Sequence, residues 1–94
     1  MAVKIHCIEK PRLSGSFFRI SSEDGKTADR LLQGHWWQAI AQDHNERVFL
    51  VIWNTDKPEE EVDWEHYDYV VQYGDFSQDV TRHVILEKNE FYNF

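Results

Sequence analysis

Residues 48–53 read Val-Phe-Leu-Val-Ile-Trp, the longest unbroken apolar run in the chain. A strand that carries apolar side chains on both faces is typical of the middle of a sheet, where other parts of the protein cover it on both sides. We therefore expect residues 48–53 to form a central strand, with the remaining elements arranged around it.

The segment that follows is expected to be a loop and then a strand. Residues 55–65 predict a loop or a single helical turn that begins near Pro58, because proline is favoured at the first position of a helix. Residues 66–73 predict a strand, since large side chains recur at every second position. These side chains are Tyr67, Tyr69, Val71 and Tyr73. A helix over residues 58–73, ended by Gly74, is the alternative, and the many β-formers favour the strand.

The segment that precedes the central strand allows two interpretations. Thr27 can cap a helix over residues 27–42, whose apolar residues fall on one helical face. These residues are Ala28, Leu31, Leu32, Trp36, Ala39 and Ile40. Gly34 costs the middle of a helix about 1 kcal/mol. The rival is therefore a helix that stops before Gly34, followed by a strand over 35–42 that turns back through residues 43–46. We favour the long helix, because its one-face pattern fits better than strict alternation does.

Simple alternation and turn-forming residues define the other expected elements. Strands are expected at residues 3–9, 16–20 and 80–87, turns or loops at 10–15, 23–26 and 74–78, and an aromatic tail at 89–94. The resulting order, ββαβββ, predicts an α+β fold. We expect a single domain over residues 1–94, with a mostly antiparallel sheet of about five strands and one helix on its face.

The composition excludes several classes of protein. The chain has 94 residues, 14 of them aromatic, and a formal net charge of −7. It lacks the clustered Lys and Arg that bind phosphate backbones, and no apolar run approaches the roughly 20 residues of a membrane span. We therefore expect neither direct nucleic-acid binding nor membrane insertion. Residues 1–9 lack the apolar core of a signal peptide, and the single Cys7 cannot form an internal disulfide, so we expect a cytoplasmic protein.

The negative charge is concentrated in residues 56–68, which hold seven acidic residues and one basic residue. A solvated loop that aids solubility is the simplest interpretation. The functional interpretation is a recognition surface for a basic protein, because charge of one sign speeds encounter and interleaved aromatic residues supply binding energy. Its residues would be Asp56, Glu59, Glu60, Glu61, Asp63, Trp64, Glu65, Tyr67 and Asp68. This hypothesis predicts a small inhibitor, immunity protein, antitoxin or nucleic-acid mimic.

The residues able to carry chemistry form no catalytic motif in the sequence. The five histidines are scattered. Cys7 falls on the same strand face as the apolar residues Val3 and Ile5, which is the position of a core residue. The alternative function is a ligand-binding or enzymatic domain with a pocket between helix and sheet. Its lining would be His35, Trp36, Trp37, His66, Tyr69, Tyr73 and His83. Since the carboxylates near His66 match no metal-site spacing, we expect no metal and no cofactor.

The tail is rich in aromatic residues. Its three rings belong to Phe91, Tyr92 and Phe94. Chain ends fray unless they are tied down, and three exposed rings would leave a large apolar patch in water. We therefore expect the tail to dock on protein across a homodimer interface, where two-fold symmetry uses the same patch twice.

Overall fold

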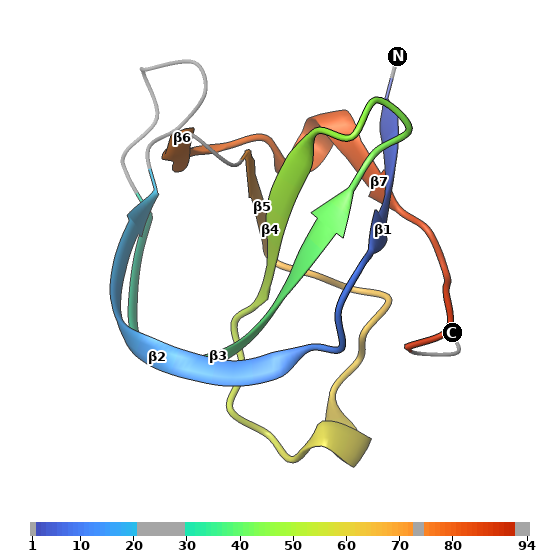
Figure 1. The fold of residues 1–94 in the computed structure, drawn as a ribbon. Helices are drawn as coiled ribbons and strands as arrows, with labels where there is room; N and C mark the ends of the chain where they lie inside the picture. Colours follow the sequence, from blue (N-terminus) through green and yellow to red (C-terminus); the bar gives the residue numbers. More distant parts are fainter. Residues whose placement is uncertain (1, 21–29, 73–74, 92–94) are drawn as a thin grey trace.

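The computed structural model describes residues 2–20, 30–72 and 75–91, and these residues form one curled sheet (Figure 1). The strands are β1 (Val3–Cys7), β2 (Arg12–Ile20), β3 (Arg30–Gln42), β4 (Val48–Trp53), β5 (Tyr69–Gln72), β6 (Asp75–Asp79) and β7 (Val84–Leu86). Two short 3₁₀ helices, η1 (Glu59–Glu61) and η2 (Thr81–His83), lie between strands. Within these residues, no helix is long and apolar enough to cross a membrane.

The sheet is organised around the long strand β3. The strand order is β6-β5-β4-β3-β1-β7, and β2 pairs with β3 outside that path. Residues 30–38 of β3 pair with β2, whereas residues 37–42 pair with β4, so β3 belongs to both halves of the sheet. Among the described strands, the pairing of β1 with β7 is parallel and the other pairs are antiparallel. The sheet thereby curls into a mixed half-barrel (Figure 1).

The expectation for residues 48–53 is confirmed, because β4 is a central strand with both faces buried. One face contributes to a first core cluster, formed by Ile5, Cys7, Ala39, Ala41, Phe49, Val51, Trp53, Val70, Val84 and Leu86. The other face contributes to a second core cluster, formed by Ile20, Leu32, Trp36, Leu50, Ile52 and Val71. The unbroken apolar run follows from this, since a strand between two clusters has no face left for polar side chains.

The α+β class and the helix over residues 27–42 are wrong. Residues 30–42 form β3, and the described part of the chain is nearly all sheet, with no helix to cover a face. The strand of the rival interpretation, over residues 35–42, is correct, as is its return through residues 43–46 into β4. The helix that the rival placed before Gly34 is wrong, because residues 30–33 are also strand.

The helix-like spacing in this segment comes from a strand that is buried on both faces. Trp36 and Ile40 pack against the second core cluster, whereas Ala39 and Ala41 belong to the first. Two interleaved strand faces of this kind place apolar residues three and four positions apart, which is also the spacing of one helical face. Gly34 also has a backbone conformation that is incompatible with a right-handed helix, because its φ is 87°.

Two expected turns are wrong because they lie inside strands. β2 begins at Arg12 and runs through Gly15, so most of the turn expected at residues 10–15 is extended. Residues 75–79 form β6, in place of the turn expected at 74–78. Pro11, Gly15 and Gly74 suggested these turns. In the sheet, the absence of a side chain on Gly15 allows the backbones of β2 and β3 to lie close together.

Other boundaries are closer to expectation. The helical turn near Pro58 is confirmed as η1, and the strand expected over residues 3–9 is confirmed in β1. Of the strand expected over residues 66–73, β5 covers residues 69–72, and residues 80–87 divide into η2 and β7. The loop expected at 23–26 lies outside the described residues.

The ribbon formed by β2 and β3 bends where two glycines meet. A Cβ placed on Gly15 would fall on the carbonyl oxygen of Gly34 and would lie 2.8 Å from the Cα of His35. Ser16 pairs with Gly34, and their φ angles of 145° and 87° both lie in the region that favours glycine. The two backbones are therefore in direct contact at the bend, and Figure 1 shows β2 curving around the sheet with β3.

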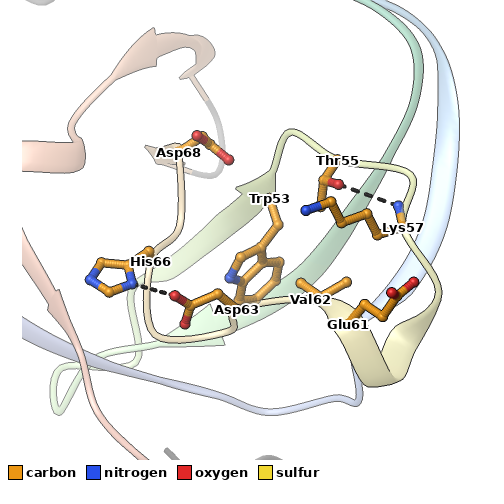
Figure 2. Close-up of a pocket in the computed structure, with 8 residues that line it drawn as sticks. All are labelled: Trp53, Thr55, Lys57, Glu61, Val62, Asp63, His66 and Asp68. Atoms are coloured by element: carbon orange, nitrogen blue, oxygen red, sulfur yellow. Dashed lines mark hydrogen bonds and ion pairs between the residues drawn. The ribbon is translucent and has the colours of Figure 1, made fainter.

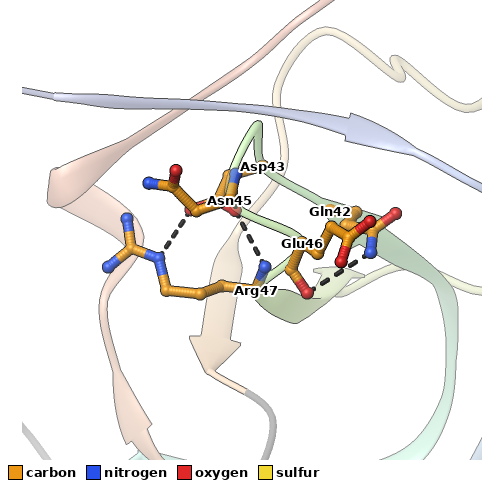
Figure 3. Close-up of polar contacts among 5 residues, drawn as sticks. All are labelled: Gln42, Asp43, Asn45, Glu46 and Arg47. Carbon is orange, nitrogen blue, oxygen red and sulfur yellow. Dashed lines mark hydrogen bonds and ion pairs between the residues drawn. The ribbon is translucent and has the colours of Figure 1, made fainter.

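Asp43 organises the turn between β3 and β4 (Figure 3). Its side chain is 2% exposed. Its Oδ1 accepts hydrogen bonds from the backbone N–H groups of Asn45 and Arg47, at 2.9 and 2.8 Å, and its Oδ2 accepts one from Nε of Arg47 at 2.6 Å. Burial by itself raises the pKa of Asp43, but these hydrogen bonds and the guanidinium charge outweigh it and hold the pKa below the ordinary 3.8.

We expect Asp43→Asn to lower the free energy of unfolding at neutral pH by about 1–2 kcal/mol, because the amide loses the charge-assisted bond to Arg47. A carboxyl with a lowered pKa stabilises the fold above its unfolded pKa, and this contribution disappears as the pH falls through the folded pKa. The variant should therefore lose less stability than the wild type between neutral pH and pH values below about 4. Urea unfolding across this range measures the difference.

The matched control for this prediction is Asp56→Asn, which neutralises an exposed aspartate. It should leave the neutral-pH stability within about 0.5 kcal/mol of the wild type. If Asp43→Asn and the wild type lost the same stability on acidification, the buried carboxylate would not account for the fall in the free energy of unfolding at low pH.

Candidate functional site

The chain between β4 and β5 forms a long excursion (Figure 1), and it carries seven of the 17 acidic residues. We call residues 56–68 the acidic loop. Its end is tied to the end of β4 and the residue that follows it by two hydrogen bonds of Asp68: the backbone N–H donates to the carbonyl oxygen of Ile52 at 2.9 Å, and Oδ2 accepts from the backbone N–H of Asn54 at 2.6 Å. The loop therefore returns to the strand from which it departs.

A group of three tryptophans holds the middle of the acidic loop against the sheet. The ring of Trp64 makes edge-to-face contacts with Trp53 and Trp37, with centroid distances of 5.0 and 5.5 Å. Nε1 of Trp53 donates to the carbonyl oxygen of Trp64 at 3.1 Å, and Nε1 of Trp37 donates to that of Lys57 at 2.9 Å. Since Trp53 is 1% exposed, the loop is attached directly to the first core cluster.

Tyr67 fixes the last turn of the acidic loop. Its half-buried ring packs on the first core cluster, and its hydroxyl donates to the carbonyl oxygen of Val84 at 3.0 Å. Burial raises the pKa of Tyr67 above its ordinary 10.0, more than the backbone N–H of Leu86 lowers it, so the hydroxyl remains a neutral donor at physiological pH. Trp64 and Tyr67, expected to anchor a partner, thus pack inside the protein and immobilise the loop.

All seven carboxylates of the acidic loop belong to exposed residues. Glu59 forms an ion pair with Lys10 at 3.1 Å, and Asp63 contacts His66. Among the described residues, no ion pair engages the carboxylates of Asp56, Glu60, Glu61 and Glu65. The loop therefore presents a dense negative charge to solvent from a fixed backbone.

His66 and Asp63 form an exposed pair, with Nδ1 and Oδ2 2.6 Å apart. The hydrogen bond to Asp63, together with its charge, raises the pKa of His66 above the ordinary 6.5. The same hydrogen bond to His66 is the main cause that lowers the pKa of Asp63 below 3.8. Close to neutral pH the imidazole is thus biased toward its charged form, which partly compensates the carboxylate beside it.

A cleft of about 190 Å³ opens beside this pair (Figure 2). It is lined by Trp53, Thr55, Lys57, Glu61, Val62, Asp63, His66 and Asp68. Trp53 and Val62 supply an apolar wall, and the remaining lining is polar or charged. In Figure 2 the side chain of Lys57 points inward, toward Trp53.

Asp63, Glu65 and His66 are the described residues best placed to hold a metal ion, because their ligand atoms lie within 4.8 Å of one another. All three are exposed, and exposed carboxylates commonly gather without an ion. Mixed imidazole and carboxylate ligands suit divalent transition metals.

The residues expected to line a helix–sheet pocket do not converge, and the helix itself is absent from the described chain. Trp36 and Tyr69 pack against the second core cluster, whereas Trp37 packs against the first, on the other face of the sheet. The side chains of His35, His66 and His83 are exposed. Tyr73 lies outside the described residues.

Only part of the tail is described. Phe91 is half-buried and packs against the first core cluster of its own chain, and Nδ2 of Asn89 donates to the carbonyl oxygen of Cys7 at 2.7 Å. The tail is thus docked within the chain up to Phe91. Tyr92 and Phe94 lie outside the described residues, and a homodimer built on these rings stays a prediction.

The sequence did not indicate the residues that support the acidic loop. Two of these residues, Trp37 in β3 and Trp53 in β4, contact the acidic loop from the sheet. The other two, Lys57 and Val62, belong to the loop and line the cleft. The surplus of tryptophan was the available signal, because a ring that exceeds the needs of a small core must cover something else. Comparison with protein-family models, with curated proteins and with solved structures found no match for this chain.

Proposed function

We propose that the protein binds a basic protein through the acidic loop, in the manner of a small inhibitor, immunity protein, antitoxin or nucleic-acid mimic. One observation carries the proposal: exposed carboxylates stand on a backbone that is pinned by Trp53, Trp64 and Tyr67. A loop needed only for solubility has no reason to be attached to the core at several points.

Immobilisation matters for binding because ordering a loop at an interface costs conformational entropy. In this protein the cost is met during folding, since the loop is held by side chains of the first core cluster. Its fixed carboxylates can then match a fixed pattern of Lys and Arg side chains, which gives selectivity as well as attraction.

The proposal also covers compartment and nucleic acid. A cytoplasmic location fits the burial of Cys7 in the first core cluster, where a thiol packs as a small apolar side chain. Phosphate backbones would be repelled by the acidic loop, so the partner is a basic protein rather than a nucleic acid.

We expect Asp56→Asn combined with Glu60→Gln to slow association with the basic partner about two- to tenfold, because each exposed charge pair contributes a few tenths to 1 kcal/mol. Both side chains are exposed and lie outside the cleft. Binding of the wild type should also weaken between salt concentrations of about 0.01 and 0.15 M, as the screening length falls from about 30 to 8 Å. Affinity capture at both salt concentrations, followed by binding kinetics on the captured protein, measures these effects.

The matched control carries Glu46→Gln and Glu90→Gln, which remove the same charge from exposed positions outside the acidic loop. Its association rate should stay close to that of the wild type. If both double variants slow association equally, only the net charge matters and the loop is not the recognition surface. Failure to capture any salt-sensitive basic protein would contradict the proposed function itself.

A further inference from the structure

We propose that the cleft beside the acidic loop binds one arginine side chain of the basic partner. This inference rests on the proposed function and names the group that the site takes. The cleft has three carboxylate-bearing residues, Glu61, Asp63 and Asp68, in its lining, against the basic residues Lys57 and His66. Asp63 already bonds His66, and Asp68 already accepts from a backbone N–H group. Among the described residues, Glu61 is therefore the carboxylate in the lining that no hydrogen bond or ion pair occupies. A site with this excess of acceptors suits a cation.

The size of the cleft selects a side chain over a metabolite. Its volume of about 190 Å³ is below the roughly 300–1,000 Å³ of pockets that enclose small-molecule ligands. The wall formed by Trp53 and Val62 offers apolar surface to an aliphatic stem. Arginine and lysine both bury such stems along apolar surface while their charged ends remain in polar surroundings.

The arrangement of acceptors favours arginine over lysine. The carboxylates come from different points of the lining: Glu61 from η1, Asp63 from the centre of the acidic loop, and Asp68 from its end. A guanidinium is planar, carries five N–H donors and can bond acceptors on more than one side. The ammonium of lysine is a compact, strongly hydrated charge, and it gains less from acceptors spread around a cleft.

Lys57 shows that the cleft admits a cation of the chain itself. Its side chain points into the cleft toward Trp53 (Figure 2), and among the described residues no ion pair holds its ammonium. Glu61 is likewise without an ion pair there. An incoming arginine would therefore meet an available carboxylate and would displace a lysine that is free to swing into solvent.

The test uses a capped Gly-Arg-Gly peptide, with Gly-Lys-Gly and Gly-citrulline-Gly as matched probes, titrated into the 94-residue chain and followed by NMR. The arginine peptide should shift the indole N–H of Trp53 and the amide of Val62 at millimolar concentration, the lysine peptide should bind about two- to fivefold more weakly, and the neutral citrulline peptide should cause no saturable shift. Equal shifts from the arginine and citrulline peptides would overturn the inference.

Three variants locate the effect in the cleft. Glu61→Gln should weaken the arginine peptide about two- to fivefold, Lys57→Met should tighten it by a similar factor, and Glu60→Gln, next to the cleft but outside its lining, should change little. Equal weakening by Glu60→Gln and Glu61→Gln would mean that only long-range charge acts, and the site would be wrong. If the captured partner still requires Asp56 and Glu60 while the peptide leaves Trp53 unmoved, the arginine site fails and the proposed function stands.

Discussion

Trp53→Ala is expected to lower the free energy of unfolding by about 3–5 kcal/mol, the usual cost of removing a buried aromatic ring. Trp53 is 1% exposed and lies in the first core cluster. Its ring contacts the ring of Trp64 with a centroid distance of 5.0 Å, and its Nε1 donates a hydrogen bond to the carbonyl oxygen of Trp64 at 3.1 Å. The substitution therefore opens a cavity and also removes two contacts that attach the acidic loop to the core, the ring contact and the hydrogen bond to Trp64. Urea unfolding measures the first effect, and proteolysis within residues 56–68 under native conditions measures the second.

Trp53→Phe is the matched control, because it retains most of the ring and removes the N–H donor. It should cost about 1–2 kcal/mol, the value of a hydrogen bond plus a small cavity. Its acidic loop should be cleaved more slowly than that of Trp53→Ala. If the alanine variant were cleaved at the wild-type rate, the loop would be held by something other than the tryptophan group.

Gly15→Ala is expected to destabilise the protein by about 3 kcal/mol, at the upper end of ordinary overpacking. The new methyl group would meet the carbonyl oxygen of Gly34 and the Cα of His35, and these backbone atoms cannot rotate away as a flexible side chain would. β2 and β3 would have to separate at the bend. A loss of about 3 kcal/mol corresponds to a fall in the thermal midpoint of more than about 12 °C for a domain of this size.

Gly34→Ala separates steric overlap from backbone strain. A Cβ on Gly34 meets no atom within 4 Å, but its φ of 87° strains any L-residue, so the expected cost is about 1–2 kcal/mol. Ser14→Ala, in the same ribbon, should cost less than either glycine variant. An equal cost for Gly15→Ala and Gly34→Ala would show that the strands separate easily at the bend.

Residues 48–53 could be predicted because burial on both faces leaves a local mark, an apolar run without polar interruption. β3 was predicted only as the less favoured interpretation of residues 35–42, although its faces obey the same rule. Its two faces contribute leucine, tryptophan, alanine and isoleucine in an order that also satisfies one helical face, and the pairing of Trp37 with Trp53 and of Ala39 with Val51 shows that the segment is a strand. Trp37 and Trp53 lie 16 residues apart and Ala39 and Val51 lie 12 apart, so the spacing of residues within the segment does not reveal this pairing.

The candidate site likewise has one property that the sequence predicted and one that it did not. The charge of the acidic loop is a property of composition and was predictable, whereas the inward direction of Trp64 and Tyr67 depends on partners in β3, β4 and β7. The alternation of Tyr67 with Tyr69 suggested one shared face. The hydrogen bonds of Asp68 to β4 end that alternation, and the two tyrosines pack on different core clusters.

The parallel pairing of β1 with β7 has a consequence for synthesis of the chain. It joins residues 3–5 to residues 84–86, so closing this pair carries the largest loop-closure entropy of any in the described sheet. A nascent chain can form the hairpin of β3 and β4 as soon as it leaves the ribosome. Ile5 and Cys7 are buried much later, because Val84 and Leu86, which pack against them, are synthesised about 80 residues after them. During that interval the unfinished barrel exposes apolar surface and an unpaired strand edge, which makes it the species most in need of a chaperone.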